Sequence, residues 1–288
     1  MTVEVLFSAM HLEDFSIYER SHCTTDALII NQTDHEAYEE RVIGGRLVRM
    51  YSTTQRGLSR SRNMALIHAK GDYCLIADDD EVLSDNFEQT IMDAFERNPM
   101  ADAIAFNYKD ANPRMQNTKR KIIKTECEAP KNKSFSSVAL AFKREKVMLE
   151  GIWFNAKLGA GSGIISAGEE SVWQSLARKK GLRVFQCPAY ITTVSQAKST
   201  WFNGFDEKYF YDLGANLTAR YGMVKYIYQF YYPYRLRKET KLSIWKQLYY
   251  INAGMKGFEK GMGYKQYFDV IKVVILSIIN VVSGGVNM

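Results

Sequence analysis

The stretch Tyr73-Cys74-Leu75-Ile76-Ala77-Asp78-Asp79-Asp80 decides the fold, because an apolar run typical of a buried strand ends there in three adjacent carboxylates. The following residues, 84–88, are typical of a helix start. In an extended chain, residues i and i+2 point to the same side, so Asp78 and Asp80 can face one hard cation. Mg²⁺ and Mn²⁺ take oxygen ligands and are commonly shared with substrate phosphates. The alternative interpretation is a solvated acidic turn.

Strand and helix patterns alternate along the first 190 residues. Strands are predicted at 3–9, 27–30, 46–51, 73–77, 101–108, 136–142 and 183–186, and helices at 59–70, 85–98 and 169–180. This alternation predicts a layered α/β fold with a mainly parallel sheet, in which ligands bind at the carboxyl ends of strands. No G-x-G-x-x-G follows the first strand, so a dinucleotide-binding fold is poorly supported.

Composition separates the last third of the chain from the rest. The chain has 288 residues and a net charge of +6, and residues 201–288 carry all of that excess with twelve Lys or Arg and six Asp or Glu. We therefore expect a domain boundary near residue 200. The four cysteines are scattered without a C-x-x-C pair, which favours a reducing compartment and argues against a zinc site. The amino terminus lacks the pattern of a signal peptide.

Two further groups of charged residues are candidates for chemistry. Arg60 and Arg62 lie in the first turns of a predicted helix, where one of them can reach toward the carboxylates and favour a diphosphate. A basic, solvated first turn is the alternative. Glu169 and Glu170 open another predicted helix, where the helix dipole favours acids. They are either simple complements to that dipole or include a general base.

The order of these motifs resembles family 2, GT-A type glycosyltransferases, over roughly residues 1–200. The matching residues are Gly57, Ser59, Arg62-Asn63, Ala69-Lys70-Gly71-Asp72-Tyr73, Asp78–Asp80 and Asp85. Further on, Leu158-Gly159-Ala160-Gly161 is similar to the family's acceptor loop, and Gly168-Glu169-Glu170 is similar to its Gly-Glu-Asp base motif.

The resemblance implies a Rossmann-like mixed sheet flanked by helices, in a catalytic domain at 1–200 that is split into a nucleotide-sugar half (1–108) and an acceptor half (109–200). Beyond it, from the composition, we expect a basic, aromatic, helical extension at 201–288. The implied site residues fall into four groups. The donor site has Asn31 and Gln32 at the nucleobase, with Arg62, Asp78 and Asp79; the metal site has Asp78 and Asp80; the acceptor loop has Gly159, Gly161 and Glu169; the catalytic base is Glu170.

The implied activity is inverting, metal-dependent transfer of a sugar from a UDP-linked donor to a glycan or lipid-linked acceptor, in surface polysaccharide synthesis. Mn²⁺ or Mg²⁺ is the implied cofactor. Three features depart from the family pattern: the base is Glu170 instead of Asp, Asn31-Gln32 replaces an acidic loop, and Ser195-Gln196 stands where some relatives have a histidine. The alternatives are a sugar-nucleotidyltransferase, which should carry a basic Gly-rich loop after the first strand, and a non-catalytic sugar-binding or scaffold protein.

The carboxyl-terminal region combines aromatic and basic residues, with sixteen Phe, Trp or Tyr between Trp201 and Tyr250. Such pairs suit the headgroup layer of an anionic membrane. They also suit nucleic acid, but the first 200 residues then have no explanation, so we expect no nucleic-acid partner. The apolar run from Val273 to Val282 is shorter than the about 20 residues that span a bilayer. We predict a cytoplasmic enzyme, peripheral on the inner face of the plasma membrane; the alternative is that these helices pack on the catalytic domain or form an oligomer interface.

Overall fold

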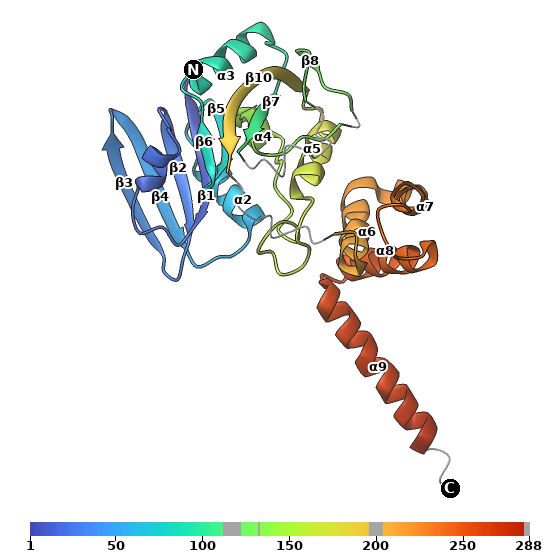
Figure 1. Cartoon of the computed structure of the whole chain (residues 1–288). Coiled ribbons are helices and arrows are strands. Elements are labelled where there is room, and N and C mark those ends of the chain that lie inside the picture. Colours follow the sequence, from blue (N-terminus) through green and yellow to red (C-terminus); the bar gives the residue numbers. More distant parts are fainter. Residues whose placement is uncertain (112–121, 132, 196–203, 285–288) are drawn as a thin grey trace. The chain divides into compact units, whose positions relative to one another are not determined.

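The computed structural model describes residues 1–111, 122–131, 133–195 and 204–284, with side chains up to residue 274 (Figure 1). The chain divides into two compact units. Unit 1 comprises Met1–Ala156 and Glu169–Ser199, and unit 2 comprises Lys157–Gly168 and Thr200–Met288. Residues 112–121, for which no helix or strand is predicted, lie outside the described residues, as do Gln196 and the side chains from 275 onward in the apolar run.

Unit 1 is built on one mixed sheet, whose described strands run in the order β3-β4-β2-β1-β5-β9-β7-β10-β6. Its strands are β1 (Val3–Met10), β2 (Asp26–Gln32), β3 (Ala37–Ile43), β4 (Arg46–Thr53), β5 (Tyr73–Asp78), β6 (Glu81–Leu83), β7 (Ala103–Asp110), β8 (Cys127–Glu128), β9 (Leu140–Lys143) and β10 (Val184–Val194). The strands β4, β2, β1 and β5 are mutually parallel, whereas β3, β9, β6 and β8 pair antiparallel with their neighbours. The sheet is therefore less parallel than the alternation of strands and helices predicts, and it is mixed, as the resemblance implies.

Helices cover both faces of this sheet. They are α1 (Ser16–Arg20), α2 (Leu58–His68), α3 (Phe87–Arg97), α4 (Arg144–Leu149) and α5 (Glu169–Lys179). Neighbouring residues of β1 point to opposite faces, so Phe7 packs in the core formed with α1 and α3, while Leu6 packs in the core formed with α2, α4 and α5. Burial of both faces explains why the central strands are apolar runs rather than alternating patterns.

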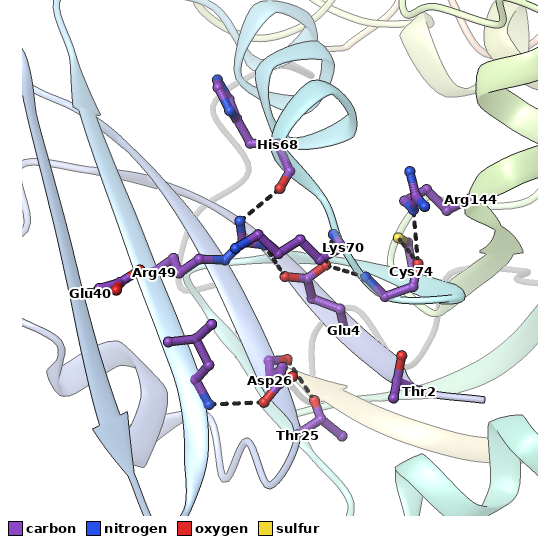
Figure 2. A network of polar contacts seen from close by, with 12 residues as sticks. Thr2, Glu4, Thr25, Asp26, Glu40, Arg49, His68, Lys70, Cys74 and Arg144 are labelled. Carbon is purple, nitrogen blue, oxygen red and sulfur yellow. Dashed lines mark hydrogen bonds and ion pairs between the residues drawn. The ribbon is translucent and has the colours of Figure 1, made fainter.

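A buried ion pair fixes the turn between α2 and β5 (Figure 2). Glu4 on β1 binds the Arg49 guanidinium at 2.5 Å, and its second oxygen accepts hydrogen bonds from the backbone N–H groups of Lys70 and Gly71 at 2.6 and 2.8 Å. Arg49 also donates to the His68 carbonyl oxygen that ends the helix. A Cβ atom on Gly71 would lie 2.6 Å from the Glu4 Cβ, so this position needs glycine. The contacts thus set where β5, and the acids after it, begin.

Unit 2 combines the loop at 157–168 with a carboxyl-terminal part that is helical where it is described. Its helices are α6 (Glu207–Tyr221), the 3₁₀ turn η1 (Gly222–Val224), α7 (Lys225–Leu236), α8 (Ile244–Glu259) and α9 (Tyr264–Gly284). Two glycines allow close packing of α6 on α8: a Cβ atom on Gly214 or Gly254 would lie within 2.0 Å of backbone oxygen on the facing helix. Among the described residues, no helix combines the length and the apolar character needed to cross a bilayer.

Candidate active site

The candidate site lies where the parallel strands of unit 1 end. Ser8 of β1 is paired with Asp78 of β5 on one side and with Ile30 of β2 on the other, so the three strands finish at one edge. The first acid of the triplet therefore stands beside the ends of β1 and β2. This edge is where open α/β sheets bind their ligands.

The acidic run at this edge is longer than the triplet. Asp78 is partly exposed, Asp79 is exposed, and Asp80 is half-buried, while the neighbouring Glu81 is 3% exposed. Glu81 accepts a hydrogen bond from the Asp78 backbone N–H at 2.8 Å and one from the Thr192 hydroxyl at 3.2 Å. The sequence analysis does not predict Glu81 as a site residue, although its position next to the triplet could have indicated it.

Three acids of this run, Asp79, Asp80 and Glu81, have a raised pKa and hold their protons more tightly than free carboxylates do. Burial, followed by the charges of Asp78 and Asp79, raises the pKa of Asp80 to about 6. Burial and the Asp78 charge also raise the pKa of Asp79 and, much further, that of Glu81. Such crowding destabilises the ionised forms and favours a cation at this position.

Arg62 of α2 is the positive charge that pairs with this run among the residues that the structure describes. Its side chain is 2% exposed and donates to Asp78 at 3.1 Å through one terminal nitrogen and to Glu169 at 3.3 Å through the other. The ring of Phe154 lies 5.6 Å from the guanidinium carbon, and Asn63 holds that residue by exchanging two hydrogen bonds with its backbone. Phe154 is a second contributor that was not selected from the sequence. By contrast, Arg60 is exposed and donates to the Arg56 carbonyl oxygen.

The two acids that open α5 have different surroundings. Glu169 is 6% exposed and faces Arg62, and burial, together with the charge of Glu170, raises its pKa to about 7. Glu170 is less buried and accepts a hydrogen bond from the Ser137 hydroxyl at 2.8 Å. Arg62 thus links the acid at the end of β5 to the helix that carries both candidate base residues.

The side chains of Asn31 and Gln32 are buried and already bonded. Asn31 accepts from the Leu12 backbone N–H and donates to the Leu12 carbonyl oxygen, both at 2.9 Å. The Gln32 side-chain oxygen accepts from the Gly57 N–H at 2.7 Å, at the position where α2 begins. Gly57 has a φ of +116°, which explains glycine here. These contacts give both residues a part in positioning the loop after β1 and the start of α2; contact with a nucleobase stays a prediction.

The glycines of the predicted acceptor loop lie in unit 2. Gly159 and Gly161 have φ values of +98° and +71°, and the loop closes on itself through a bridge between Leu158 and Ile165. With Lys208 and other residues of unit 2 they line a cavity of about 670 Å³. Their role toward an acceptor stays a prediction.

No three His, Cys, Asp or Glu side chains in the described parts of the chain are grouped so that they could hold a metal ion by themselves. The carboxylate oxygens of the acidic run still fit Mg²⁺ or Mn²⁺, which are often bound through one or two carboxylates plus substrate phosphates. Ser195 lies beside this run: its N–H and hydroxyl both donate to the Asp80 carbonyl oxygen, at 3.0 and 2.9 Å. It therefore ties the end of β10 to the acidic run.

Comparisons with known proteins give a match to a family model over part of the chain, and a fold. Residues 31–153 match the sequence model of the family described as Glycosyl transferase family 2. A search of curated protein sequences finds no match. Among solved structures, S. aureus TarS 1–349 in complex with UDP-GlcNAc is 10% identical, with a TM-score of 0.60 over 92% of this chain and 93% of that chain.

Two other TarS structures are also similar. TarS 1–349 in complex with UDP gives a TM-score of 0.59 at 11% identity, over 92% of this chain and 93% of that chain. A longer TarS chain, of which 43% is covered, gives 0.55 at 11% identity over 90% of this chain. At such identities the likeness shows the fold. The matched segment contains Arg62 and the acidic run, and it confirms the resemblance read from the sequence: residues 31–153 match the model of glycosyl transferase family 2, and the chain has the fold of the GT-A glycosyltransferase TarS.

Proposed function

We propose that this chain is an inverting glycosyltransferase that moves a sugar from a UDP-linked donor to a glycan or lipid-linked acceptor. The observation that carries the proposal is the Arg62 bridge, which joins Asp78 at the end of β5 to Glu169 at the start of α5. A donor-side acid and a pair of candidate bases are thereby held in one charge network. The family match supports the reaction class, and the complexes of TarS with UDP-GlcNAc and UDP support a UDP-linked donor.

Glu170 is the base in this proposal. It accepts the proton of the acceptor hydroxyl while that oxygen bonds to the anomeric carbon and the bond from this carbon to the UDP oxygen breaks. One displacement from the opposite face inverts the anomeric centre. A pKa near 7 would by itself favour Glu169 as a base at neutral pH. Glu169, however, is buried against Arg62, whereas Glu170 is the more accessible of the two.

Asp78 and Asp80 would hold the divalent cation, with Asp79 as an alternative ligand. When bound, Mg²⁺ or Mn²⁺ supplies positive charge that stabilises the leaving nucleoside diphosphate. Arg62 orients the Asp78 carboxylate by its bond at 3.1 Å. Ser195 fixes the backbone of Asp80 through its carbonyl oxygen.

The setting in surface polysaccharide synthesis follows from the family resemblance. All four cysteines are free thiols, which agrees with the reducing compartment expected from their spacing. We propose a cytoplasmic site of action on this ground.

The experiment is a measurement of UDP release from UDP-linked sugars with Mn²⁺, using lipid and glycan extracts as acceptors, beside calorimetric titration with UDP. The proposal predicts that Glu170→Gln lowers transfer by about 10²–10⁴-fold, the usual contribution of a general base. UDP affinity should stay nearly unchanged, because the base acts on the acceptor.

Glu169→Gln is the matched control for this test, since it removes the neighbouring acid. Transfer lost in Glu169→Gln but kept in Glu170→Gln would assign the base to Glu169. Pyrophosphate release from UTP and a sugar phosphate, without UDP release, would replace the proposal with a nucleotidyltransferase. Binding of UDP without any turnover of the tested donors would favour a non-catalytic protein.

A further inference from the structure

Helix α7 of unit 2 exposes an apolar surface. Six of its twelve residues are exposed, and Arg235 is the only charged one among them. The other five, which we call the aromatic stripe, are Tyr226, Ile227, Phe230, Tyr231 and Tyr234, with exposed fractions between 45% and 69%. A surface helix ordinarily buries its apolar side and exposes charged residues. The stripe is therefore the reverse of what a solvated helix shows.

The opposite side of α7 already holds the helix on unit 2. Tyr228, Tyr232 and Leu236 pack against the core formed by α6 and α8, which includes Phe210 and Ile251. At its first residue, Lys225 pairs with Glu259 of α8 at 2.8 Å. Because these contacts anchor α7, the stripe is not needed to keep the helix in place. Its exposed aromatic side chains need another explanation.

Basic residues precede and follow the aromatic stripe in the sequence, and one of them lies against its last residue. Residues 213–258 carry eight Lys or Arg and one acid, Glu239. Arg235, Arg237, Lys238, Lys241 and Lys246 of this segment are all exposed. The Arg237 guanidinium lies 4.1 Å from the ring centre of Tyr234, the last residue of the stripe. Apolar and cationic groups thus occur together at the end of α7.

We propose that the aromatic stripe is a docking surface for the headgroup layer of an anionic lipid bilayer. Tyrosine suits that layer, because its ring is apolar and its hydroxyl stays hydrated. A helix with an apolar face and basic neighbours binds in the plane of such a surface. A second copy of this chain fits less well, since it would bring two segments with the same positive excess together. The inference does not depend on the chemistry of unit 1.

The test is co-sedimentation of the full chain with vesicles of phosphatidylcholine, with and without phosphatidylglycerol. The parent should bind only the anionic vesicles strongly. Phe230→Ser with Tyr234→Ser should weaken binding by about tenfold or more, because two aromatic side chains that the bilayer would bury are lost. Lys238→Glu with Lys241→Glu should weaken it by more than about 25-fold, at about fivefold for each cation removed. All four side chains are exposed, so thermal melting should be unchanged.

Matched controls come from unit 1. Leu149→Ser removes an apolar side chain that is 74% exposed, and Lys146→Glu reverses an exposed charge on the same short helix. Both controls should bind vesicles like the parent. Equal binding by parent, stripe variants and charge variants would overturn the proposal. Absence of binding of the parent to anionic vesicles would also overturn it. So would a dimer of the parent in light scattering that the stripe variants do not form.

Discussion

Replacing Glu169 with glutamine should make the protein more stable at neutral and alkaline pH. Glutamine keeps an oxygen that can accept the bond from Arg62, now at 3.3 Å, but it cannot ionise. It therefore mimics the protonated form of Glu169, which the fold prefers because burial and the Glu170 charge raise the pKa of this group to about 7. The gain arises from removing a charge that the folded protein holds unfavourably.

The magnitude follows from the two pKa values of Glu169. The pKa of this carboxyl group has its usual value of 4.5 in the unfolded chain and rises to about 7 in the folded protein. The group therefore lowers the free energy of unfolding as pH rises between those two values. The cost grows at about 1.4 kcal/mol per pH unit and reaches about 3 kcal/mol above the upper value. Glu169→Gln should thus be about 3 kcal/mol more stable than the parent near pH 8, and equal to it near pH 4.5.

The assay is urea unfolding of parent and variant across this range. Glu145→Gln is the control, because it removes an exposed carboxylate of α4 and should shift stability by less than about 0.5 kcal/mol. A parent that is more stable than Glu169→Gln near pH 8 would refute the reasoning. The ion pair with Arg62 would then outweigh the cost of burial.

Three further predictions concern the same network and its support. Asp78→Asn or Asp80→Asn should abolish Mn²⁺-dependent binding of UDP in calorimetry while circular dichroism stays unchanged; intact binding in both would remove the metal-site assignment. Arg62→Met should lower the free energy of unfolding by about 3–5 kcal/mol, as for other buried ion pairs that lose one partner. This loss should be larger near pH 8 than near pH 5, because Glu169 then lacks its countercharge; a loss independent of pH would contradict it. Gly71→Ala should lower the free energy of unfolding by about 1–3 kcal/mol, because its Cβ meets Glu4; an unchanged urea midpoint would show that the turn can shift.

Much of the site could be predicted because its signals are local. An apolar run of strand length followed by carboxylates is visible in one window of sequence, and β5 with its acidic end is found there. The helix starts at α2 and α5 are likewise marked by glycine and acids within a few residues. Glu81 was not predicted as a site residue, because the strand that pairs with it and the hydroxyl that binds it belong to β10, far along the chain.

The pairing of distant segments was decided by tertiary structure. Arg62 and Glu169 are 107 positions apart, and no periodic pattern tells which of two arginines will reach an acid on another helix. The sequence also does not predict that β9 lies antiparallel between β5 and β7, since a short apolar run does not indicate the direction in which its strand pairs.

The sequence by itself determined that the chain begins with an α/β fold carrying an acidic cluster and ends in a basic, aromatic region. Only the tertiary structure decided that residues 157–168 pack with that last region, and which side of α7 is exposed. The physical reason is that α7 is apolar and aromatic around most of its circumference. The hydrophobic periodicity of α7 then cannot select which face is buried, and packing against α6 and α8 selects it.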